Sequence, residues 1–322
     1  MTRRAFVAGL GALLAAPLAA RAQDWPMHAV RIVVPYSVGI GPDVVARAVA
    51  EALSARWRQP VIVDNKPGAS GIVAFGEVRR TPADGHTLFL ADTATLAVNP
   101  LLHATLPYDP QRDLVPVSLL FRATFLLWTG GANRLRTLAD LLDEARRAPE
   151  RVSYASLGNG HASHVAVESF ARAAGLRLLH VPFKDTGTLL TAVAAGEVDF
   201  TAIGMNTVAG LAARGKLRAL AVAARQRLPE HPAIPTLAEA GGPPLEMHPW
   251  AALVAVAGTP APVLDQLQRD LADALQSPAV KSRAEQAGFE LTPSTPQALR
   301  ERVASDVALY RPLVEEGRVA RF

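Results

Sequence analysis

Short apolar runs alternate with stretches of helical spacing along this sequence. The first runs are RIVVPY at 31–36, PVIVDN at 60–65 and HTLFLA at 86–91, and helical stretches over 42–58 and 70–80 lie between them. Short runs rich in β-branched residues are typical of buried strands. The alternation therefore predicts an α/β fold, in which helices flank a mostly parallel sheet.

A second series of the same kind follows. Its expected strands lie at 151–156, 177–183, 198–204 and 217–224, and its expected helices at 137–148, 162–174, 186–195 and up to about residue 214. The runs 114–121 and 125–130 are expected to cross between the two series, and 250–258 to return. Helical stretches over 261–276, 278–287 and 296–316 complete the chain, and the proline-rich stretch 229–244 is expected on the surface.

The two series predict two domains. The first is formed by residues 23–122 plus 248–322, and the second by residues 123–247. Half of the residues are hydrophobic, which is enough for a core in each domain. Two α/β domains joined by two crossings suit hinge closure around a ligand.

Residues 1–22 have the composition of a signal peptide. Arg3 and Arg4 precede the apolar stretch AFVAGLGALLAAPLA, and Ala20-Arg21-Ala22 forms a cleavage site before Gln23. The stretch is shorter than the roughly 20 residues that span a bilayer, so a membrane anchor is the less favoured reading. TRRAFVA also resembles a twin-arginine motif, and ordinary secretion remains the alternative. We therefore expect export to the periplasm.

Composition excludes several classes of function. The chain has no cysteine, which excludes disulfides, a lipid-attachment cysteine and thiolate metal sites. Its net charge falls from +4 to +1 without residues 1–22, because that segment holds three arginines and no acidic residue. No cluster of basic residues forms the stripe that nucleic-acid binding requires. The small positive balance favours small anionic ligands.

Two glycine loops stand at equivalent points of the two series. SVGIGPD follows the strand at 31–36, LGNGHASH follows the strand at 151–156, and a helix begins after each loop. A helix N-terminus offers free backbone N–H groups and the positive end of the helix dipole. Ligands of open α/β sheets lie beyond the carboxyl ends of the strands. One loop from each domain therefore predicts a cleft that holds a carboxylate from both sides.

Both loops also resemble the start of a dinucleotide fingerprint, with Asp64 as a candidate ribose-binding acid. Val44 and Ser163 stand where its third glycine belongs, and an exported enzyme rarely meets soluble nicotinamide cofactor. Asp43 is expected either to contact a ligand amine or water, or to cap the helix.

Other catalytic and metal readings lack a motif. His161 and His164 lie three residues apart, but no HExxH or Cys/His cluster accompanies them, so we expect them to border the cleft as hydrogen-bond donors. Neither a G-x-S-x-G elbow nor a Walker loop is found in the sequence. We therefore predict a binding protein without catalytic residues, cofactor or metal.

The mature chain resembles the Bug family, the extracytoplasmic receptors of tripartite tricarboxylate transporters. The matching stretches, in order, are RIVVPYSVGIGPD, DNKPGASG, PADGHTLFLADTATLAVNPLL, YASLGNGHASH, HVPFKDTG, GKLRALAV and PTLAEAGG. The resemblance implies a two-domain, type II-like periplasmic-binding-protein fold that binds a small carboxylate as a monomer. It also implies delivery of the ligand to a membrane permease, with docking on a sensor kinase as the alternative.

The resemblance further implies a set of ligand-binding residues in five segments. They are Tyr36, Ser37, Val38, Gly39, Ile40, Gly41 and Asp43; Asp92, Thr93 and Thr95; Ser156, Gly158, Asn159, Gly160, His161, Ser163 and His164; Phe183, Lys184, Asp185 and Thr186; and Asn206. Outside the two glycine loops, turn chemistry or helix capping is the alternative role of these residues.

Three residues depart from the family pattern. Ile40 interrupts the usual run of three glycines, and a branched side chain disfavours positive φ there. Pro42 removes an N–H and a hydroxyl from the possible donors. Asp185 stands where a glycine is typical, and an acid there would repel a second carboxylate or pair with an ammonium group. These changes favour a monocarboxylate, an aromatic acid or an amino acid over a plain dicarboxylate or tricarboxylate.

Overall fold

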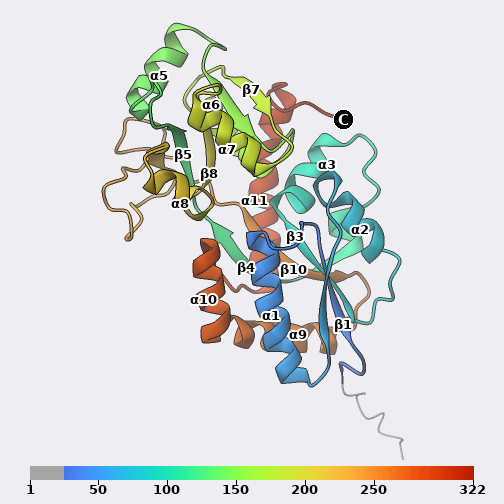
Figure 1. Ribbon diagram of the computed structural model, residues 1–322. Helices are drawn as coiled ribbons and strands as arrows, with labels where there is room; N and C mark the ends of the chain where they lie inside the picture. The colour runs from blue at the N-terminus through green and yellow to red at the C-terminus, as the bar shows by residue number, and fades with distance from the viewer. Residues whose placement is uncertain (1–24) are drawn as a thin grey trace, which may run out of the picture.

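The computed structural model describes residues 25–322 (Figure 1). The predicted signal peptide over 1–22 lies outside these residues. Among the described residues, no helix combines the length and apolar character that crossing a membrane requires. The strands form two sheets, one of six strands and one of five. We call the part built on the six-stranded sheet the first lobe and the part built on the five-stranded sheet the second lobe.

The six-stranded sheet has the order β11-β4-β10-β3-β1-β2. Its strands are β1 (Val30–Val34), β2 (Val61–Asn65), β3 (Thr87–Asp92), β4 (Leu114–Ala123), β10 (Trp250–Val256) and β11 (Phe289–Leu291). β1 pairs in parallel with β2 and β3. β10 runs antiparallel to β3 and β4, and β11 runs antiparallel to β4.

The five-stranded sheet has the order β7-β6-β8-β5-β9. Its strands are β5 (Phe125–Gly130), β6 (Ser153–Ser156), β7 (Leu179–Pro182), β8 (Phe200–Gly204) and β9 (Leu217–Val222). β6 pairs in parallel with β7 and β8, whereas β5 runs antiparallel to β8 and β9.

The strands that connect the lobes make both sheets mixed, and this corrects the expectation of mostly parallel sheets. β4 ends and β5 begins on either side of Thr124, so one continuous segment supplies a strand to each sheet. The return segment runs beside it, since Ala123 N donates to Pro249 O at 2.8 Å and Phe125 N donates to Met247 O at 3.0 Å. These paired crossings run antiparallel to each other, while the helix-linked strands remain parallel.

In the first lobe, helices cover both faces of the sheet. One face packs against α1 (Gly41–Trp57), α9 (Ala261–Gln276) and α10 (Pro278–Ala287), and the other against α2 (Ile72–Val78), η2 (Ala94–Val98) and α11 (Pro296–Glu315). Ile32 and Val34 point to the first face and Val33 to the second. Because both faces are covered, β1 is a continuous apolar run rather than an alternating one.

The second lobe likewise has helices on both faces of its sheet. α5 (Leu138–Arg147) and α6 (Ala162–Ala173) cover one face, and α7 (Thr186–Ala195) and α8 (Met205–Ala213) cover the other. Buried aromatic residues of the strands fill the core, with Tyr154 and Phe200 on the first face and Trp128 on the second.

The expected strands and long helices are all present, with ends that differ by a few residues. The short elements η1 (Ala69–Gly71), η2, α3 (Asn99–Leu102), α4 (Pro110–Asp113) and β11 were not predicted. Each is too short to show a clear periodicity in the sequence.

Helix α11 runs between the two lobes (Figure 1). It packs on β4 and η2 of the first lobe and on α6 of the second. Its C-terminal end joins Leu313, Val314 and Val319 to Val98 and Val165 in one small apolar cluster. The chain then ends beside α3, where Phe322 N donates to Leu102 O at 2.8 Å. The C-terminal segment thus contacts both lobes.

Candidate functional site

The segments with predicted site residues follow the carboxyl ends of parallel strands. β1 leads into the loop 35–40 and α1, and β3 leads into Asp92–Thr95, at the same edge of the first sheet. β6, β7 and β8 lead into α6, α7 and α8 at one edge of the second sheet. Four helix N-termini therefore gather at these two edges, as is usual for ligand sites in α/β sheets.

The buried side chain of Asp43 fixes the conformation of the first glycine loop. This side chain is 1% exposed, and its Oδ2 accepts hydrogen bonds from Gly39 N at 2.8 Å and Arg47 Nε at 2.9 Å. Its Oδ1 accepts from Asn65 Nδ2, which also donates to Tyr36 O. Burial alone would raise the pKa of Asp43, but the hydrogen bonds from Arg47, Gly39 and Asn65 lower it. Asp43 therefore shapes the loop.

The backbone of this loop accommodates Ile40 without strain. Gly39 has a φ of 85°, whereas Ile40 has a φ of −82°. The positive φ thus falls on a glycine, and the branched residue adopts an extended conformation that suits it. The expected conflict between Ile40 and the turn does not arise. The side chains of Val38 and Ile40 are 69% and 43% exposed, so the loop presents apolar surface.

We expect Asp43→Ala to loosen the first loop. The change removes the acceptor of three hydrogen bonds at a buried position, which should cost about 2–3 kcal/mol of unfolding free energy. Urea denaturation measures this loss, and calorimetry should show ligand affinity falling about tenfold. Asp64→Asn is the matched control, because its partly exposed ion pairs with Arg31 and Lys66 contribute little. Equal losses in the two variants would contradict this role of Asp43.

Asp92 holds Tyr36 at the end of β1. Tyr36 Oη donates to Asp92 Oδ2, while Asp92 Oδ1 accepts from Thr95 N at 2.8 Å and Thr95 Oγ1 at 2.9 Å. Burial raises the pKa of Asp92, and burial together with the nearby Asp92 carboxylate raises the pKa of Tyr36. Thr93 Oγ1 accepts from Trp250 N. These predicted site residues bond mainly to one another, so they position the strand end.

The second glycine loop is held by side-chain hydroxyls. Ser156 Oγ accepts from Gly158 N at 3.1 Å and lies 2.6 Å from His180 Nε2. Ser163 Oγ accepts from Leu157 N at 3.2 Å. Both hydroxyls are buried and have partners within the protein. They therefore fix the loop, and ligand binding by Ser156 and Ser163 stays a prediction.

The histidines of this loop accept hydrogen bonds through Nδ1. His161 caps α6 by accepting from Ser163 N at 3.1 Å, and His164 accepts from Gly160 N at 3.1 Å. His164 is 2% exposed and stacks on His180. Burial lowers the pKa of His161 and of His180 to about 4, and that of His164 to about 3. Neutral imidazoles thus support the loop, in contrast to the expected role as donors to the ligand.

The ends of β7 and β8 carry the remaining predicted residues. Phe183 N donates to Ser156 O at 2.8 Å, which joins the end of β7 to the second glycine loop. Asp185 caps α7 by accepting from Thr188 N at 2.9 Å, and Thr186 is the first residue of that helix. Lys184 and Asp185 are exposed. Capping accounts for Asp185 without a ligand, which was the alternative role considered for it.

Two sets of contacts show that the strand ends of the two lobes face each other. Asn206 Nδ2, at the start of α8, donates to Glu285 O at 2.9 Å and to Gln286 O at 3.1 Å in the first lobe. Gly160 lies so close to Leu102 that an added Cβ would come within 2.4 Å of Leu102 Cδ1. The two glycine loops therefore stand on either side of one interface between the lobes.

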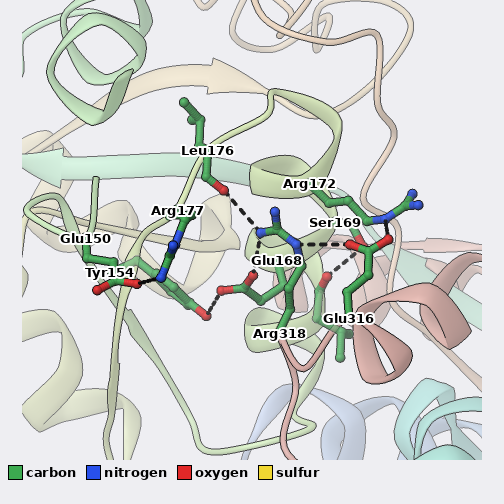
Figure 2. Close-up of polar contacts among 10 residues, drawn as sticks. Glu150, Tyr154, Glu168, Ser169, Arg172, Leu176, Arg177, Glu316 and Arg318 are labelled. Atoms are coloured by element: carbon green, nitrogen blue, oxygen red, sulfur yellow. Dashed lines mark hydrogen bonds and ion pairs between the residues drawn. The ribbon is translucent and has the colours of Figure 1, made fainter. Parts of the chain in front are cut away.

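The C-terminal segment is bonded to the second lobe, in part through Arg318 and Glu168 (Figure 2). Asn159 Nδ2 of the second loop donates to Ala320 O at 2.8 Å. Buried Glu168 on α6 accepts from Tyr154 Oη at 2.6 Å and pairs with Arg318 Nη1 at 3.3 Å. Arg318 also donates to Leu176 O at 3.1 Å. The segment after α11 is thus bonded directly to the second lobe.

Several backbone N–H groups at these helix N-termini remain without an acceptor. Within residues 25–322, the N–H groups of Gly41 and Asp43 in α1 and those of Asn159 and Ala162 at α6 make no hydrogen bond. α1 and α6 are long helices, whose dipoles favour an anion at these ends. The arrangement offers fixed donors from both lobes to a carboxylate.

Sequence reasoning missed three contributors to the site. Asn65 links the first loop to Asp43, and its signal was its place at the end of a strand parallel to β1. Leu102 and Ala320 contact the second loop from segments far away in the sequence. No local pattern points to these two residues.

The fold and the candidate site together define the class of protein to which this chain belongs. Two α/β lobes with two crossings, facing each other through the carboxyl ends of their strands, form the fold of periplasmic binding proteins. Residues 45–318 match the model of the tripartite tricarboxylate transporter family receptors. The chain belongs to this family, whose members are substrate-binding receptors and not enzymes.

Similarity to individual known proteins agrees with this family assignment. The chain is 32% identical over 312 residues to protein BugT of Bordetella pertussis, covering 97% of this chain and 94% of BugT. It is similar to the structure of R. palustris Rpa4515 with adipate, at a TM-score of 0.82 and 31% identity over 93% of this chain and 100% of that one. MatC from Rhodopseudomonas palustris with bound malate gives a TM-score of 0.78 and 28% identity, with 89% and 99% covered.

Proposed function

We propose that this protein is a periplasmic receptor that binds a small carboxylate between its lobes and delivers it to a membrane transporter of the tripartite tricarboxylate type. The observation that carries the proposal is that α1 and α6 begin at the facing strand ends of the two lobes, and that their N–H groups at Gly41 and Ala162 have no acceptor among residues 25–322. Each charge-assisted hydrogen bond contributes about 1.5–3 kcal/mol. A few such bonds suffice for micromolar affinity, which corresponds to about −8 kcal/mol.

In this proposal, side chains hold the two glycine loops in place and do not bind the ligand themselves. Asp43, Asp92, Ser156 and His164 fix the two loops, and the backbone N–H groups contact the carboxylate. Preorganised donors bind an anion without rearrangement, which increases affinity. Adipate and malate in the two similar structures are both small carboxylates. Many of the predicted site residues therefore fix the conformation of the loops, and the backbone N–H groups bind the ligand.

The exposed side chains of Val38 and Ile40 favour a ligand with an apolar body. Together they present apolar surface beside the N-terminus of α1. Burying a methylene group contributes about 0.8 kcal/mol. We therefore infer that the preferred ligand combines a carboxylate with an aliphatic or aromatic body. An apolar monocarboxylate, an aromatic acid and a long dicarboxylate such as adipate all meet this description.

A thermal-shift screen with calorimetric confirmation tests the proposal. The panel contains adipate, malate, benzoate, a medium-chain monocarboxylate and amino acids, and a ligand of the native state raises Tm in a saturable way. We expect at least one carboxylate to bind with micromolar affinity and the matching neutral amide not to bind. Failure of every acid, or equal binding of acid and amide, would contradict it.

Ile40→Gly tests the inferred preference for an apolar body. The change restores a run of three glycines and removes a branched side chain from the first loop. We expect affinity for apolar acids to fall five- to tenfold, because buried apolar contact is lost, and affinity for malate to change less than twofold. Calorimetry with both ligands measures the ratio. Parallel losses for both ligands would show that Ile40 does not determine specificity.

Domain boundaries, export and partner form part of the same proposal. The boundaries 122/123 and 247/248 are supported by the paired crossings, where Ala123 bonds to Pro249 and Phe125 to Met247. Export is supported by the composition of residues 1–22. The permease partner is supported by the family, whose receptors belong to tripartite transporters. Co-purification with permease subunits from membranes, in the presence of ligand, would test the partner directly.

A further inference from the structure

Three potential metal ligands lie together away from the proposed carboxylate site. His28 precedes β1, and Asp84 and His86 precede β3, so all three stand at the amino-terminal edge of these parallel strands. Each offers one ligand atom, and the three atoms lie within 4.8 Å of one another. The rings of His28 and His86 are stacked, with centroids 3.7 Å apart. Two imidazoles and a carboxylate thus meet in one place.

His86 has a buried nitrogen with no partner. Its side chain is 7% exposed, and its Nδ1 makes no hydrogen bond among the described residues. This atom lies 3.3 Å from Asp84 Oδ1. Two ligands at about 2.0–2.1 Å from one tetrahedral zinc ion are about 3.3 Å apart. The two atoms are therefore spaced as they would be on a shared ion, and an ion would satisfy the nitrogen.

Asp84 and His28 would contribute to the site in different ways. Asp84 is held in place because its Oδ1 accepts from His86 N at 2.8 Å. His28 is exposed, so its ring can turn toward an ion by leaving its stack with His86 and the 3.2 Å contact of its Nδ1 with Ala29 O. Asp84 is itself 45% exposed, which leaves a path from solvent to the site.

We propose that His28, Asp84 and His86 bind a divalent transition-metal ion, for which Zn²⁺ is the probe. Imidazole nitrogen and carboxylate oxygen are ligands that Zn²⁺ accepts, and three protein ligands leave a fourth position for water. Binding at His86 Nδ1 places the ring proton on Nε2, so the 3.2 Å contact from Met27 N must open. Met27 is 51% exposed, so water can take the place of His86 as the acceptor of its N–H when an ion binds.

The ion would join two segments of the first lobe. It would link the residues before β1 to the turn before β3, whose strands are neighbours in the sheet. The site lies at the opposite edge of these strands from the glycine loop. Metal binding should therefore stabilise the first lobe without competing with the carboxylate ligand.

Calorimetric titration of the full chain with ZnCl₂ tests this site, using protein prepared without a histidine tag and stripped with a chelator. We expect one ion per chain and a rise in Tm of about 3–5 °C at a hundredfold excess over Kd. His28→Ala and Asp84→Asn should each weaken binding at least tenfold. His231→Ala, a histidine outside the cluster, should leave it unchanged.

A second readout separates the site from nonspecific binding. The backbone amide of Met27 should shift in NMR spectra on addition of Zn²⁺ to the wild type, and should not shift in His28→Ala. Carboxylate affinity should remain within twofold of its metal-free value. Absence of saturable Zn²⁺ binding in the wild type would overturn the proposal, as would unchanged affinity in both variants.

Discussion

Gly160→Ala is expected to lower carboxylate affinity at least tenfold. An added Cβ at this position would come within 2.4 Å of Leu102 Cδ1, and Leu102 is buried in the first lobe. Because the overlap lies between the lobes, the protein relieves it most easily by opening, and an open form separates the two sets of N–H donors. Calorimetry measures the affinity, and small-angle scattering should show an increased radius of gyration.

The strain of a positive φ must be separated from this overlap. Gly160 has a φ of 74°, and Gly175 has a φ of 66° with no atom within 4 Å of an added Cβ. Gly175→Ala therefore introduces a similar backbone strain of about 1–2 kcal/mol without a clash. We expect it to lower the unfolding free energy and leave affinity unchanged. Equal affinities of the two alanine variants would refute the role of the contact between Gly160 and Leu102.

Arg318→Ala is expected to destabilise the protein by about 3 kcal/mol at neutral pH. The change leaves the buried Glu168 carboxylate without its cationic partner, and such a charge is costly. The pair joins the C-terminal segment to α6, so its loss should also weaken ligand binding (Figure 2). Arg172→Ala is the matched control, because Arg172 and Glu316 form an exposed pair nearby that contributes less than about 1 kcal/mol.

The destabilisation should depend on pH. Burial raises the pKa of Glu168 above its ordinary value of 4.5 even with Tyr154 and Arg318 bonded to it. A raised carboxyl pKa favours the folded state at low pH, and that contribution is lost as the pH rises through the folded pKa. Without Arg318 the pKa rises further, so Arg318→Ala should lose most stability at neutral pH and little at pH 4.5. The same loss at both pH values would contradict this explanation.

A second substitution tests whether the charge of Glu168 causes the loss of stability in Arg318→Ala. Glu168→Gln keeps an acceptor for Tyr154 Oη and removes the charge. In this background, Arg318→Ala should cost only about 1 kcal/mol, because it removes the hydrogen bond to Leu176 O but leaves no buried charge without a partner. Urea denaturation of the four proteins measures the coupling. An additive pair of losses would show that Arg318 acts through packing alone.

Periodicity predicted the helices because each buries one face, and continuous apolar runs predicted strands such as β1 because helices cover both of their faces. The helix expected over 186–195 is α7, with the same limits. The direction of strands was harder to predict, since β5 and β10 owe their antiparallel pairing to the crossings at Thr124 and Pro249. Local sequence does not encode which strand lies beside which.

The site could be predicted as two loops but not as a set of contacts. A strand, a glycine turn and a helix N-terminus are local features, and SVGIGPD and LGNGHASH show them directly. The partners of Asp43 and Asn159 are not local: Asn65 lies across a strand pair, and Ala320 lies at the end of the chain. The sequence therefore predicted the residues of the candidate site, and the structure was needed to show which of their polar atoms already have partners within the protein.

A crystal structure with the tightest-binding acid from the screen would show directly whether a carboxylate binds between the two lobes. We expect lobes in contact and a carboxylate between the N-termini of α1 and α6, with an oxygen within about 3.2 Å of a backbone nitrogen from each loop. Gly41 and Ala162 are the expected donors. A ligand held by one lobe alone, or bound away from both glycine loops, would contradict it.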